Sequence, residues 1–440
     1  MSIEKSDDRT ELILTTLTEA FEPLMEADAE AFRTKFRKMA ADPFAFYRGS
    51  ACVFYADMRE LEDRWADERT SRVWIHGDLH AENFGTYMNA EGVLTFDVND
   101  FDEAYVGHFS WDLRRFVASL ALMGWQKALP EDAVRELAGA YLRAYVERVH
   151  VYVEEEHDSA YGLHLDNAEG HILDVLRAAR RATRIALLEG LTELNGDERR
   201  LRRSGAAREL DDDERERVME AFRSYLATIP PSKRERREIY YDVKDIVGRS
   251  GFGIGSAGLA AYNVLIEGRD QAHENDVILT MKQGNVPAAS RIVTDRRIRE
   301  HFEHEGQRTV ISQRALQQHT DPLLGYTTIE GVGYVVADLS PYEADLDWSD
   351  ITEPDAIRPV VADLGRATAK IHCISDSDSD EGLVEFSTEE AIATVLNGEQ
   401  DAFVEDLIDF GSEYAQRARR DHELFVDAFR GGHFEHVSAT

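Results

Sequence analysis

The side chains best suited to chemistry lie in one stretch of the chain, residues 71–103. It contains the run HGDLHAEN at 76–83, which is followed by the run FDVNDFD at 96–102. Two short apolar segments, 73–75 and 93–96, flank these polar runs and have the composition of β-strands. Carboxylates and an amide are therefore concentrated around one predicted β-hairpin.

The turn of this hairpin is predicted at Asn89–Gly92. A tight hairpin would bring Asp78, Asn83 and Asp97 to the same end of the ribbon. Carboxylates that lie close together repel one another unless a proton or a cation joins them, so the cluster predicts a divalent-metal site. The alternative is a solvated acidic loop in a protein that is acidic throughout.

A second set of residues with chemical potential lies at 244–284. Three glycines are spaced as Gly253-x-Gly255-x-x-Gly258, a pattern that ordinary turns also use. No helix is predicted to open at Gly258, which disfavours a Rossmann dinucleotide fold. Two strand-like segments follow, and the second carries Lys282, a charge that is costly in an apolar setting unless it is paired. Glycine loop, hairpin and strand lysine together predict a cradle for phosphate groups.

Helical and strand-like segments surround these two sets. Apolar residues recur with helical spacing in the segments 9–40, 112–126, 131–190, 295–318, 356–373 and 386–430. The charged stretch 196–239 is typical of solvated helix and connector, and it sets the predicted domain boundary. We expect an α+β protein with a helical part, 1–239, a small β-rich part, 240–345, and a segment, 346–440, that completes the helical part.

Composition excludes some classes of partner. The chain has 440 residues and a net charge of −35, from 85 acidic and 50 basic residues, of which only 8 are lysines. A nucleic acid or an anionic membrane needs a positive protein surface, so neither is expected as the main partner. The acidic, lysine-poor composition resembles that of proteins from salt-loving microbes.

The remaining signals favour a cytoplasmic protein. Cys52 and Cys373 lie far apart and follow no metal-ligand spacing, which is typical of buried thiols in a reducing compartment. The N-terminal segment is polar, and the longest apolar run, 116–125, is too short to span a bilayer.

HGDLHAEN followed by FDVND resembles the catalytic loop and metal-binding segment of the protein-kinase-like superfamily, in its aminoglycoside- and choline-phosphotransferase branch. The pattern there is H-G-D-x-x-x-x-N, followed by a hydrophobic residue and Asp on the next strand. The resemblance implies one catalytic base and three metal ligands: Asp78 as the base, Asn83 as a ligand, Asp97 as the principal Mg²⁺ ligand and Asp100 as a second carboxylate. It also implies structural roles for His76, His80 and Asp112.

The same resemblance assigns the nucleotide site. The loop with Gly253, Gly255 and Gly258 would cover the phosphates of ATP, and Lys282 would grip them. The backbone of Val336–Asp338 would be the hinge that binds adenine.

The order of these parts differs from that of an ordinary kinase. There the glycine loop and the lysine precede the catalytic loop, whereas here they follow it. The helix that leads into the catalytic loop resembles 356–373, near the C-terminus. The resemblance therefore implies a protein-kinase-like two-lobe fold, circularly permuted, with a small β-rich lobe and a large helical lobe. Permutation is tolerated when the new ends fall in surface loops.

That order, with the segments DPFAFYRG, GDLHAENFG, FDVNDFDE and WDLRRFVASL, closely resembles the DUF2252 family over most of residues 33–430. The resemblance supplies an architecture and no acceptor substrate. One departure concerns the glutamate that pairs with the strand lysine in active kinases. Its candidates here are Glu300, Glu303 and Glu305, and the segment at Gln313 resembles a family motif.

We therefore expect a phosphotransferase that uses ATP and Mg²⁺ and acts on a hydroxyl group of a small-molecule or protein acceptor. Asp78 would orient and deprotonate the hydroxyl. Two alternatives stay open: a kinase-like protein that is catalytically impaired or transfers AMP, and a metal-dependent hydrolase with His76, His80 and nearby aspartates around Zn²⁺ or Mn²⁺. Arg48 is either an ordinary salt-bridge residue or an anion contact near the site.

Overall fold

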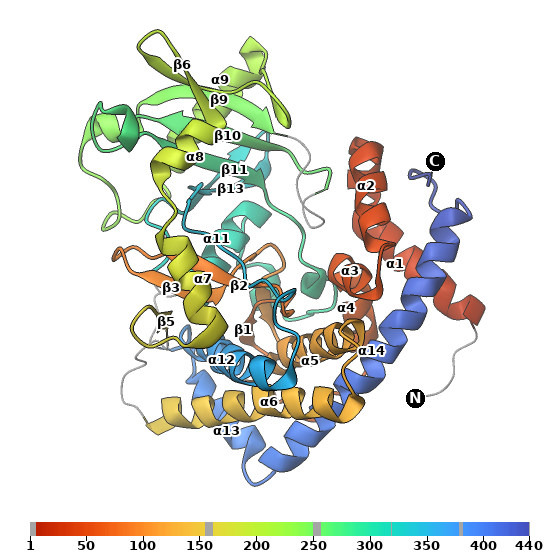
Figure 1. The fold of residues 1–440 in the computed structure, drawn as a ribbon. Helices are drawn as coiled ribbons and strands as arrows, with labels where there is room; N and C mark the ends of the chain where they lie inside the picture. The colour runs from red at the N-terminus through yellow and green to blue at the C-terminus, as the bar shows by residue number, and fades with distance from the viewer. Residues whose placement is uncertain (1–5, 155–161, 250–256, 318, 378–381, 440) are drawn as a thin grey trace.

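The computed structural model of the chain describes residues 6–154, 162–249, 257–317, 319–377 and 382–439. It is 51% helical and 15% strand, with several sheets, so the predicted α+β class is confirmed. Figure 1 shows one large sheet above a helical body, with the long helix near the C-terminus running beside the first helix.

The large sheet has six strands, each antiparallel to its neighbours, in the order β12-β13-β11-β10-β9-β8. The strands are β8 (Ala207–Arg208), β9 (Val243–Arg249), β10 (Ala261–Ile266), β11 (Val277–Gln283), β12 (Gly325–Ile329) and β13 (Val332–Asp338). The register places Lys282 of β11 between Ala261 of β10 and Val335 of β13. Because β8 belongs to this sheet, the β-rich part begins before the predicted boundary at residue 240.

The two faces of β11 have different surroundings. Val277, Leu279 and Met281 share one apolar core with α9 (Asp212–Tyr225), whereas Ile278 packs on the other side with Leu188 of α8 (Arg184–Leu191). Farther along that second side the strand presents Thr280 and then the exposed Lys282. The lysine therefore stands where the apolar cover of the sheet ends.

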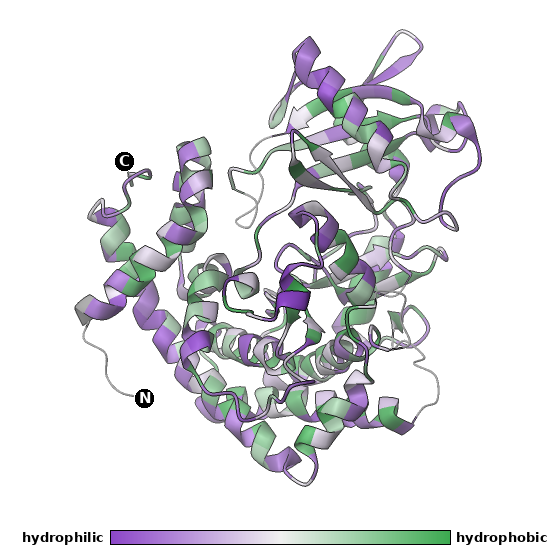
Figure 2. Cartoon of the chain, turned by 180° about the vertical axis from the view of Figure 1, so that it is seen from behind, coloured by the Kyte–Doolittle hydropathy of each residue, from purple (hydrophilic) through white to green (hydrophobic). Residues whose placement is uncertain are grey.

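The helical body combines the beginning and the end of the chain. The helices of its first part are α1 (Ser6–Ala27), α2 (Ala29–Met39), α3 (Pro43–Gly49), α4 (Ala51–Glu60), α5 (Phe109–Gln126), α6 (Glu131–Glu154) and α7 (Gly170–Arg180). Those of its last part are α12 (Pro354–Cys373), α13 (Thr388–Leu396) and α14 (Gln400–Arg430). α12 packs along α6, where a Cβ on Gly365 would lie 2.2 Å from the carbonyl oxygen of Tyr141, and α14 packs along α5. Residues 346–440 thus complete the helical part, and Figure 2 shows the hydrophobic residues gathered in its interior helices and in the strands.

In the described part of the chain, three smaller sheets accompany the large one. They are β1 (Val73–Ile75) with β4 (Tyr105–Gly107), β2 (Phe84–Met88) with β3 (Leu94–Val98) and β5 (Leu163–His164), and β6 (Thr192–Asn195) with β7 (Glu198–Leu201). The sheet formed by β6 and β7 packs on β9, on the side away from the helical body (Figure 1). The predicted turn at 89–92 joins β2 to β3, but the segment 73–75 pairs with β4 and not within that hairpin. The remaining helices are α10 (Arg296–Arg299), α11 (Glu305–Leu316), η1 (Glu238–Tyr241), η2 (His273–Asn275) and η3 (Ala288–Arg291).

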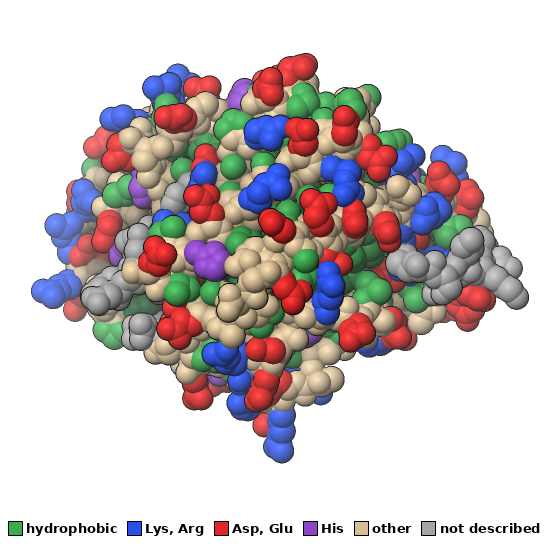
Figure 3. All heavy atoms as spheres, turned by 90° about the horizontal axis from the view of Figure 1, so that it is seen from below, with side chains coloured by type: hydrophobic (Ala, Val, Ile, Leu, Met, Phe, Trp, Pro, Cys, Tyr) green, Lys and Arg blue, Asp and Glu red, His purple; other side chains and the backbone are tan. Residues whose placement is uncertain are grey.

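The surface carries many acidic side chains and both cysteines are buried, as the composition predicts. Figure 3 shows Asp and Glu side chains spread over the face seen from below, with Lys and Arg between them. Cys52 and Cys373 are both free thiols and both buried. Among the helices in the described part of the chain, none has the length and apolar content that crossing a membrane requires.

One buried arginine joins both ends of the helical body. Arg9 of α1 donates to both carboxylate oxygens of Asp57 in α4, at 2.6 and 2.8 Å, and to both oxygens of Asp421 in α14, at 2.9 and 2.5 Å. The guanidinium is only 6% exposed. Three helices that lie far apart in sequence therefore depend on one cation.

Replacing Arg9 by Ala should lower the free energy of unfolding by about 3–5 kcal/mol, because the buried Asp421 loses the guanidinium that it binds and Asp57 keeps only Arg417, at 3.3 Å. Arg59→Ala serves as the control, since Arg59 pairs on the surface with Glu60 and the change should cost less than about 1 kcal/mol. Urea denaturation followed by tryptophan fluorescence measures both. Equal midpoints for the two variants would contradict the structural role of Arg9.

Candidate functional site

The 76–83 loop follows β1 and is fixed by a carboxylate from α5. Asp112 accepts the backbone N–H of His76 through Oδ2 at 2.6 Å and that of Gly77 through Oδ1 at 2.9 Å. Gly77 has a φ of +80°, and a Cβ there would lie 2.0 Å from the carbonyl oxygen of Glu103, so only glycine fits. The fully buried Asp112 thus holds the backbone that precedes Asp78.

Asp78 is held at the mouth of this loop by Arg115. The Nε of Arg115 donates to Asp78 Oδ1 at 2.6 Å, and the buried guanidinium lies over the rings of Tyr47 and Phe54. The side-chain amide of Asn83 donates to the backbone carbonyl of Asp78 at 2.9 Å, so these two predicted residues are brought together. Burial raises the pKa of Asp78, although the neighbouring Arg115 opposes that change.

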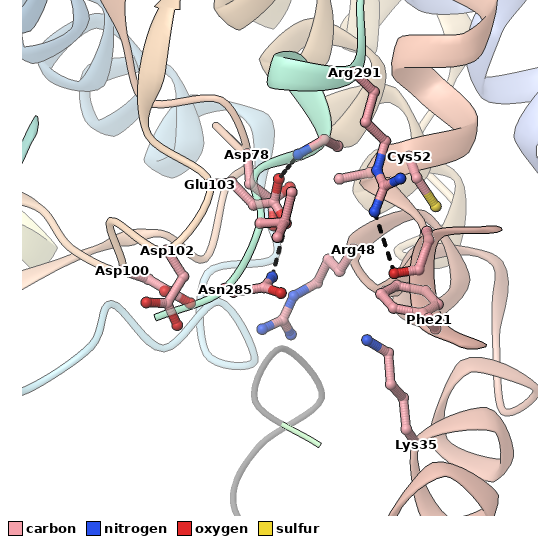
Figure 4. A pocket seen from close by; sticks show the side chains of 15 residues that line it. Phe21, Lys35, Arg48, Cys52, Asp78, Asp100, Asp102, Glu103, Asn285 and Arg291 are labelled. Carbon is pink, nitrogen blue, oxygen red and sulfur yellow. Dashed lines mark hydrogen bonds between the residues drawn. The ribbon is translucent and has the colours of Figure 1, made fainter. Parts of the chain in front are cut away.

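Asp78 lines a pocket that is open to solvent. Acidic residues from the loop after β3 form one side of it: Asp100, Asp102 and Glu103. The segment after β11 contributes Asn285 and Arg291, and the N-terminal helices contribute Phe21, Lys35, Arg48 and Cys52. Figure 4 shows the carboxylates of Asp100 and Asp102 on one side, Lys35 on the opposite side and Arg48 between them.

The loop after β3 that contains Asp100, Asp102 and Glu103, called the acidic loop below, brings carboxylates close together. Asp100 is exposed and has a φ of +61°, a conformation that is unusual for a residue other than glycine and is typical of functional sites. Burial and the nearby charge of Asp100 raise the pKa of Asp102 to about 6. Burial raises the pKa of Glu103 to about 7, and its carboxylate accepts hydrogen bonds from Asn285 and from the backbone of Ala288.

Arg308 of α11 fixes the backbone of this loop. Its guanidinium donates to the carbonyl oxygens of Ala104 at 2.7 Å, Asp102 at 2.8 Å and Asn285 at 2.7 Å. Its Nε donates to Glu305 at 2.8 Å. One side chain, 1% exposed, therefore joins α11, the acidic loop and the segment after β11.

Lys282 lies on the same side of the molecule as the acidic loop. Its positive charge acts on Asp102 and on Glu343, where it opposes the rise in their pKa values. Burial raises the pKa of Glu343, which follows β13, to about 7. Two of the predicted partners of the lysine, on or near α11, pair with arginines instead: Glu300 with Arg296 and Glu305 with Arg308.

Asp97 occupies a different position from the one that the spacing predicts. Its carboxylate accepts a hydrogen bond from Lys370 of α12, and both side chains are buried. Asp97 and Lys370 line a separate small pocket together with His164 and His319. Asp97 has its own counter-ion and lines a different pocket from Asp78, so the structure does not bring it into the acidic cluster that its spacing predicts.

The predicted hinge also needs correction. Val336 is hydrogen-bonded inside the sheet between Met281 and Gly325, so its backbone cannot serve as a hinge. The N–H of Asp338 donates to Asp321 at 2.8 Å, and its carboxylate binds Arg184 through two hydrogen bonds, at 3.0 and 2.7 Å. Backbone groups free of the sheet occur only beyond Leu339, whose N–H still donates to Ile278.

The glycine loop is only partly within the described residues. Gly253 and Gly255 lie outside them. Gly258 has a φ of +77°, and a Cβ there would lie 3.0 Å from the carbonyl oxygen of Leu24 and 3.2 Å from the ring of Phe32. The segment that follows the glycine motif therefore packs against α1 and α2, next to the pocket.

The two histidines of the loop have structural contacts. His76 Nε2 bonds the carbonyl of Asn99 at 2.7 Å, and His80 Nε2 accepts from Arg48 at 3.3 Å. Arg48 also pairs with Glu82, so it makes a salt bridge and lines the pocket at once. Within the described ranges, no group of three or more His, Cys, Asp or Glu side chains is arranged to hold a metal ion.

Sequence reasoning missed the cations that organise the site: Arg115, Arg308, Lys35 and Lys370. A signal existed for Arg115, because two arginines interrupt the apolar helix WDLRRFVASL. Buried charges are rare unless they have partners, so those arginines pointed to buried acids. The other three cations lie far from the hairpin in sequence, and no local pattern connects them to it.

Comparison with known proteins gives one match. The family described as "Uncharacterized protein conserved in bacteria (DUF2252)" matches residues 27–428. No curated protein matches the chain, and no solved structure matches it. The family match covers most of the chain, including the pocket residues from Lys35 to Arg291, while Ala20 and Phe21 of the N-terminal wall precede it. The chain therefore belongs to the DUF2252 family.

Proposed function

We propose that this chain is an ATP- and Mg²⁺-dependent phosphotransferase with a circularly permuted kinase-like fold. One observation carries the proposal: Arg308 binds the carbonyl oxygens of both Asp102 and Asn285, so the segment just after Lys282 on β11 is fixed to the loop whose Asp102 lines the same pocket as Asp100 and Asp78. The kinase-like resemblance implies that the phosphate-binding lysine and the acidic hairpin belong to one nucleotide site in spite of the reversed chain order. In this proposal Asp100 and Asp102 take the metal-binding role that the resemblance implies for Asp97.

The succession of elements supports the same architecture. In protein kinases the lysine lies on the third strand of the small lobe, and the next helix contributes its partner glutamate. Here β11 is the third strand of the run β9, β10 and β11, and α11 is the next helix of more than one turn. α12, which resembles the helix before a catalytic loop, packs against β1, the strand that leads into His76–Asn83. The contact between α12 and β1 therefore supports a permuted arrangement, in which the helix lies beside the catalytic loop although it follows that loop in the sequence.

The acidic loop fits a magnesium ion. Mg²⁺ takes oxygen ligands, usually one or two carboxylates with waters and phosphate oxygens. Asp100 and Asp102 repel each other, as the raised pKa of Asp102 reflects, and a cation would relieve that repulsion. Asn83, which the kinase-like resemblance implies as a ligand and whose Nδ2 donates to the backbone carbonyl of Asp78 at 2.9 Å, is the third candidate ligand. When bound, Mg²⁺ would neutralise charge on the transferred phosphate.

The chain's own residues would position the reactants. Asp78, fixed by Arg115 and by the loop contacts of Asp112, would accept the hydrogen bond of the acceptor hydroxyl and take its proton. Lys282 would bind phosphate oxygens of the nucleotide. The segment 340–343 would replace the predicted hinge, since Thr86 of β2 binds the carbonyl of Tyr342 at 2.7 Å and so connects that segment to the β2–β3 hairpin.

Transfer of AMP, or nucleotide binding without transfer, is the second candidate. Glu305 of α11, a candidate for the lysine-binding glutamate of a kinase, pairs with Arg308, and Arg115 compensates the charge of Asp78. Both features depart from an active protein kinase. ATP labelled at the α- or γ-phosphate separates the outcomes, because phosphoryl transfer moves only the γ label to the acceptor and AMP transfer moves only the α label.

Asp78→Asn should lower ATP turnover by about 10²–10⁴-fold, because the amide cannot accept the proton of the hydroxyl. Nucleotide affinity should change little, since Asp78 does not contact the nucleotide in the proposed site. Steady-state ATP turnover and nucleotide titration measure the two properties, with Asp166→Asn, an exposed acid outside the pocket, as the control. Unchanged turnover in Asp78→Asn would rule out a base role for this residue.

Asp100→Asn and Asp97→Asn distinguish the two assignments of the metal ligand. Asp100→Asn should weaken Mg²⁺-dependent ATP binding about tenfold or more with little change in stability. Asp97→Asn should instead lower stability by about 3–5 kcal/mol, because Lys370 is left buried without its carboxylate, while the Mg²⁺ dependence persists. Calorimetric titration with and without Mg²⁺ provides the comparison, and the reverse pattern would restore Asp97 as the ligand.

Arg308→Lys should loosen the acidic loop, since a lysine cannot reach the three carbonyl oxygens that the planar guanidinium spans. Amide hydrogen exchange should accelerate at residues 101–104 and 285–288, and stability should fall by about 2–4 kcal/mol. Arg299→Lys, an exposed change near the start of α11, is the matched control. Exchange rates equal to those of the control would show that Arg308 does not hold the loop.

A further inference from the structure

The wall of the pocket opposite the acidic loop contains an unusual lysine. Lys35 of α2 is 4% exposed, and Figure 4 shows its ammonium directed into the pocket. Among the described residues, it has no hydrogen-bond or ion-pair partner, and its nearest recorded contacts are the rings of Phe21, 3.9 Å from Nζ to the centroid, and Phe32, at 5.4 Å. A buried ammonium of this kind is costly to keep.

The cost is notable in this chain. Only 8 of its 440 residues are lysines, yet one of them is buried against phenylalanine rings. Burial lowers the pKa of Lys35 to about 8, so the side chain is still mainly charged at neutral pH. Packing alone would be served better by methionine or leucine, which fill the same space without dehydrating a charge. The charges of Glu103 and Asp78 act on this ammonium, but neither carboxylate is hydrogen-bonded to it, so the position leaves room for a ligand of opposite charge in direct contact.

The surroundings of Lys35 are built to leave space for such a ligand. Small residues at the junction of α3 and α4, Gly49, Ala51 and Cys52, line the pocket beside it. Arg48, at the end of α3, is held in place by Glu82 and His80 and presents a second cation between Lys35 and the acidic loop. α3 itself is anchored, since Asp42 caps its start at 2.9 Å and Pro43 occupies its first turn.

We propose that Lys35, with Arg48, binds an oxyanion group, a phosphate or a carboxylate, of the compound that accepts the phosphoryl group. The assignment of the compound as the acceptor rests on the proposed function, in which Asp78 receives the acceptor hydroxyl. The pocket then has a cationic end at Lys35 and an acidic end at Asp78 and Asp100, which matches a small hydroxyl compound with an anionic group. The anion site itself does not depend on catalysis.

Inorganic phosphate and acetate are the probes for this site, each titrated into the full chain by calorimetry. Lys35→Met should weaken the binding of at least one probe roughly tenfold or more, because a charge-assisted contact is lost. It should also raise the melting temperature, since a buried charge without a counter-ion is removed. Lys38→Met, an exposed change on the same helix, should alter neither property.

Equal probe affinity in Lys35→Met and Lys38→Met, or no binding of either probe to the wild-type chain, would overturn the proposal. A lower melting temperature in Lys35→Met with unchanged probe binding would make Lys35 structural. Should that variant not fold, reductive ¹³C-methylation of the wild-type lysines gives the same answer. A buried dimethyl-lysine resonance that phosphate or acetate shifts supports the site, and one that neither shifts overturns it.

Repeating the titration with ADP and Mg²⁺ present separates this proposal from the proposed function. Additive binding of probe and nucleotide places the anion on the acceptor side. Competition would overturn that placement, because Lys35 would then contact nucleotide phosphates. If no nucleotide binds at all but the Lys35-dependent anion site remains, the phosphotransferase proposal fails and the oxyanion site stands without its acceptor role.

Discussion

Repulsion among carboxylates is the constraint on which the site depends. Four acids line one pocket in a chain with a net charge of −35: Asp78, Asp100, Asp102 and Glu103. Arg115 compensates Asp78, and backbone and amide donors compensate Glu103. The other two are brought close by a loop that Arg308 grips through carbonyl oxygens, without a hydrogen bond to their carboxylates. A metal ion, together with a phosphate-binding lysine, would compensate the charge that remains on these two carboxylates.

Distant parts of the sequence supply these compensating groups, which explains the arrangement of the chain. The hairpin comes from the first hundred residues. Arg308, which fixes the acidic loop, comes from α11, and Lys282 comes from β11. α12 and α14 then return to pack on α6 and α5, and Arg9 ties α1 to α14. The pocket is therefore a product of the whole fold, and no short piece of the chain contains it.

Local patterns predicted the parts of this structure that local physics determines. The strand–turn–strand pattern around Asn89–Gly92 gave the β2–β3 hairpin, helical periodicity gave α5 and α12, and the HGD spacing put Asn83 onto the backbone of Asp78. Asp97 shows where such reasoning stops. Its spacing was compatible with the cluster, but a lysine from near the end of the chain, Lys370, neutralises it elsewhere. A long-range ion pair leaves no trace in the sequence around either partner.

The hinge prediction failed for a related reason. Val336 lies near the end of a strand-like run, but β11 and β12 both pair with it. Only the order of the strands in the sheet reveals this pairing. The sheet boundary at residue 240 was late because β8 has two residues and a charged neighbourhood. Strand propensity is weak in such short, polar edges.

The most direct test of the central claim is a crystal structure of the full chain with Mg²⁺ and a non-hydrolysable ATP analogue. The account predicts phosphates between Lys282 and the acidic loop, with Asp100 and Asp102 on the metal and the adenine against the segment after β13. A nucleotide bound away from β11, or a metal held by Asp97 in place of Asp100, would contradict it.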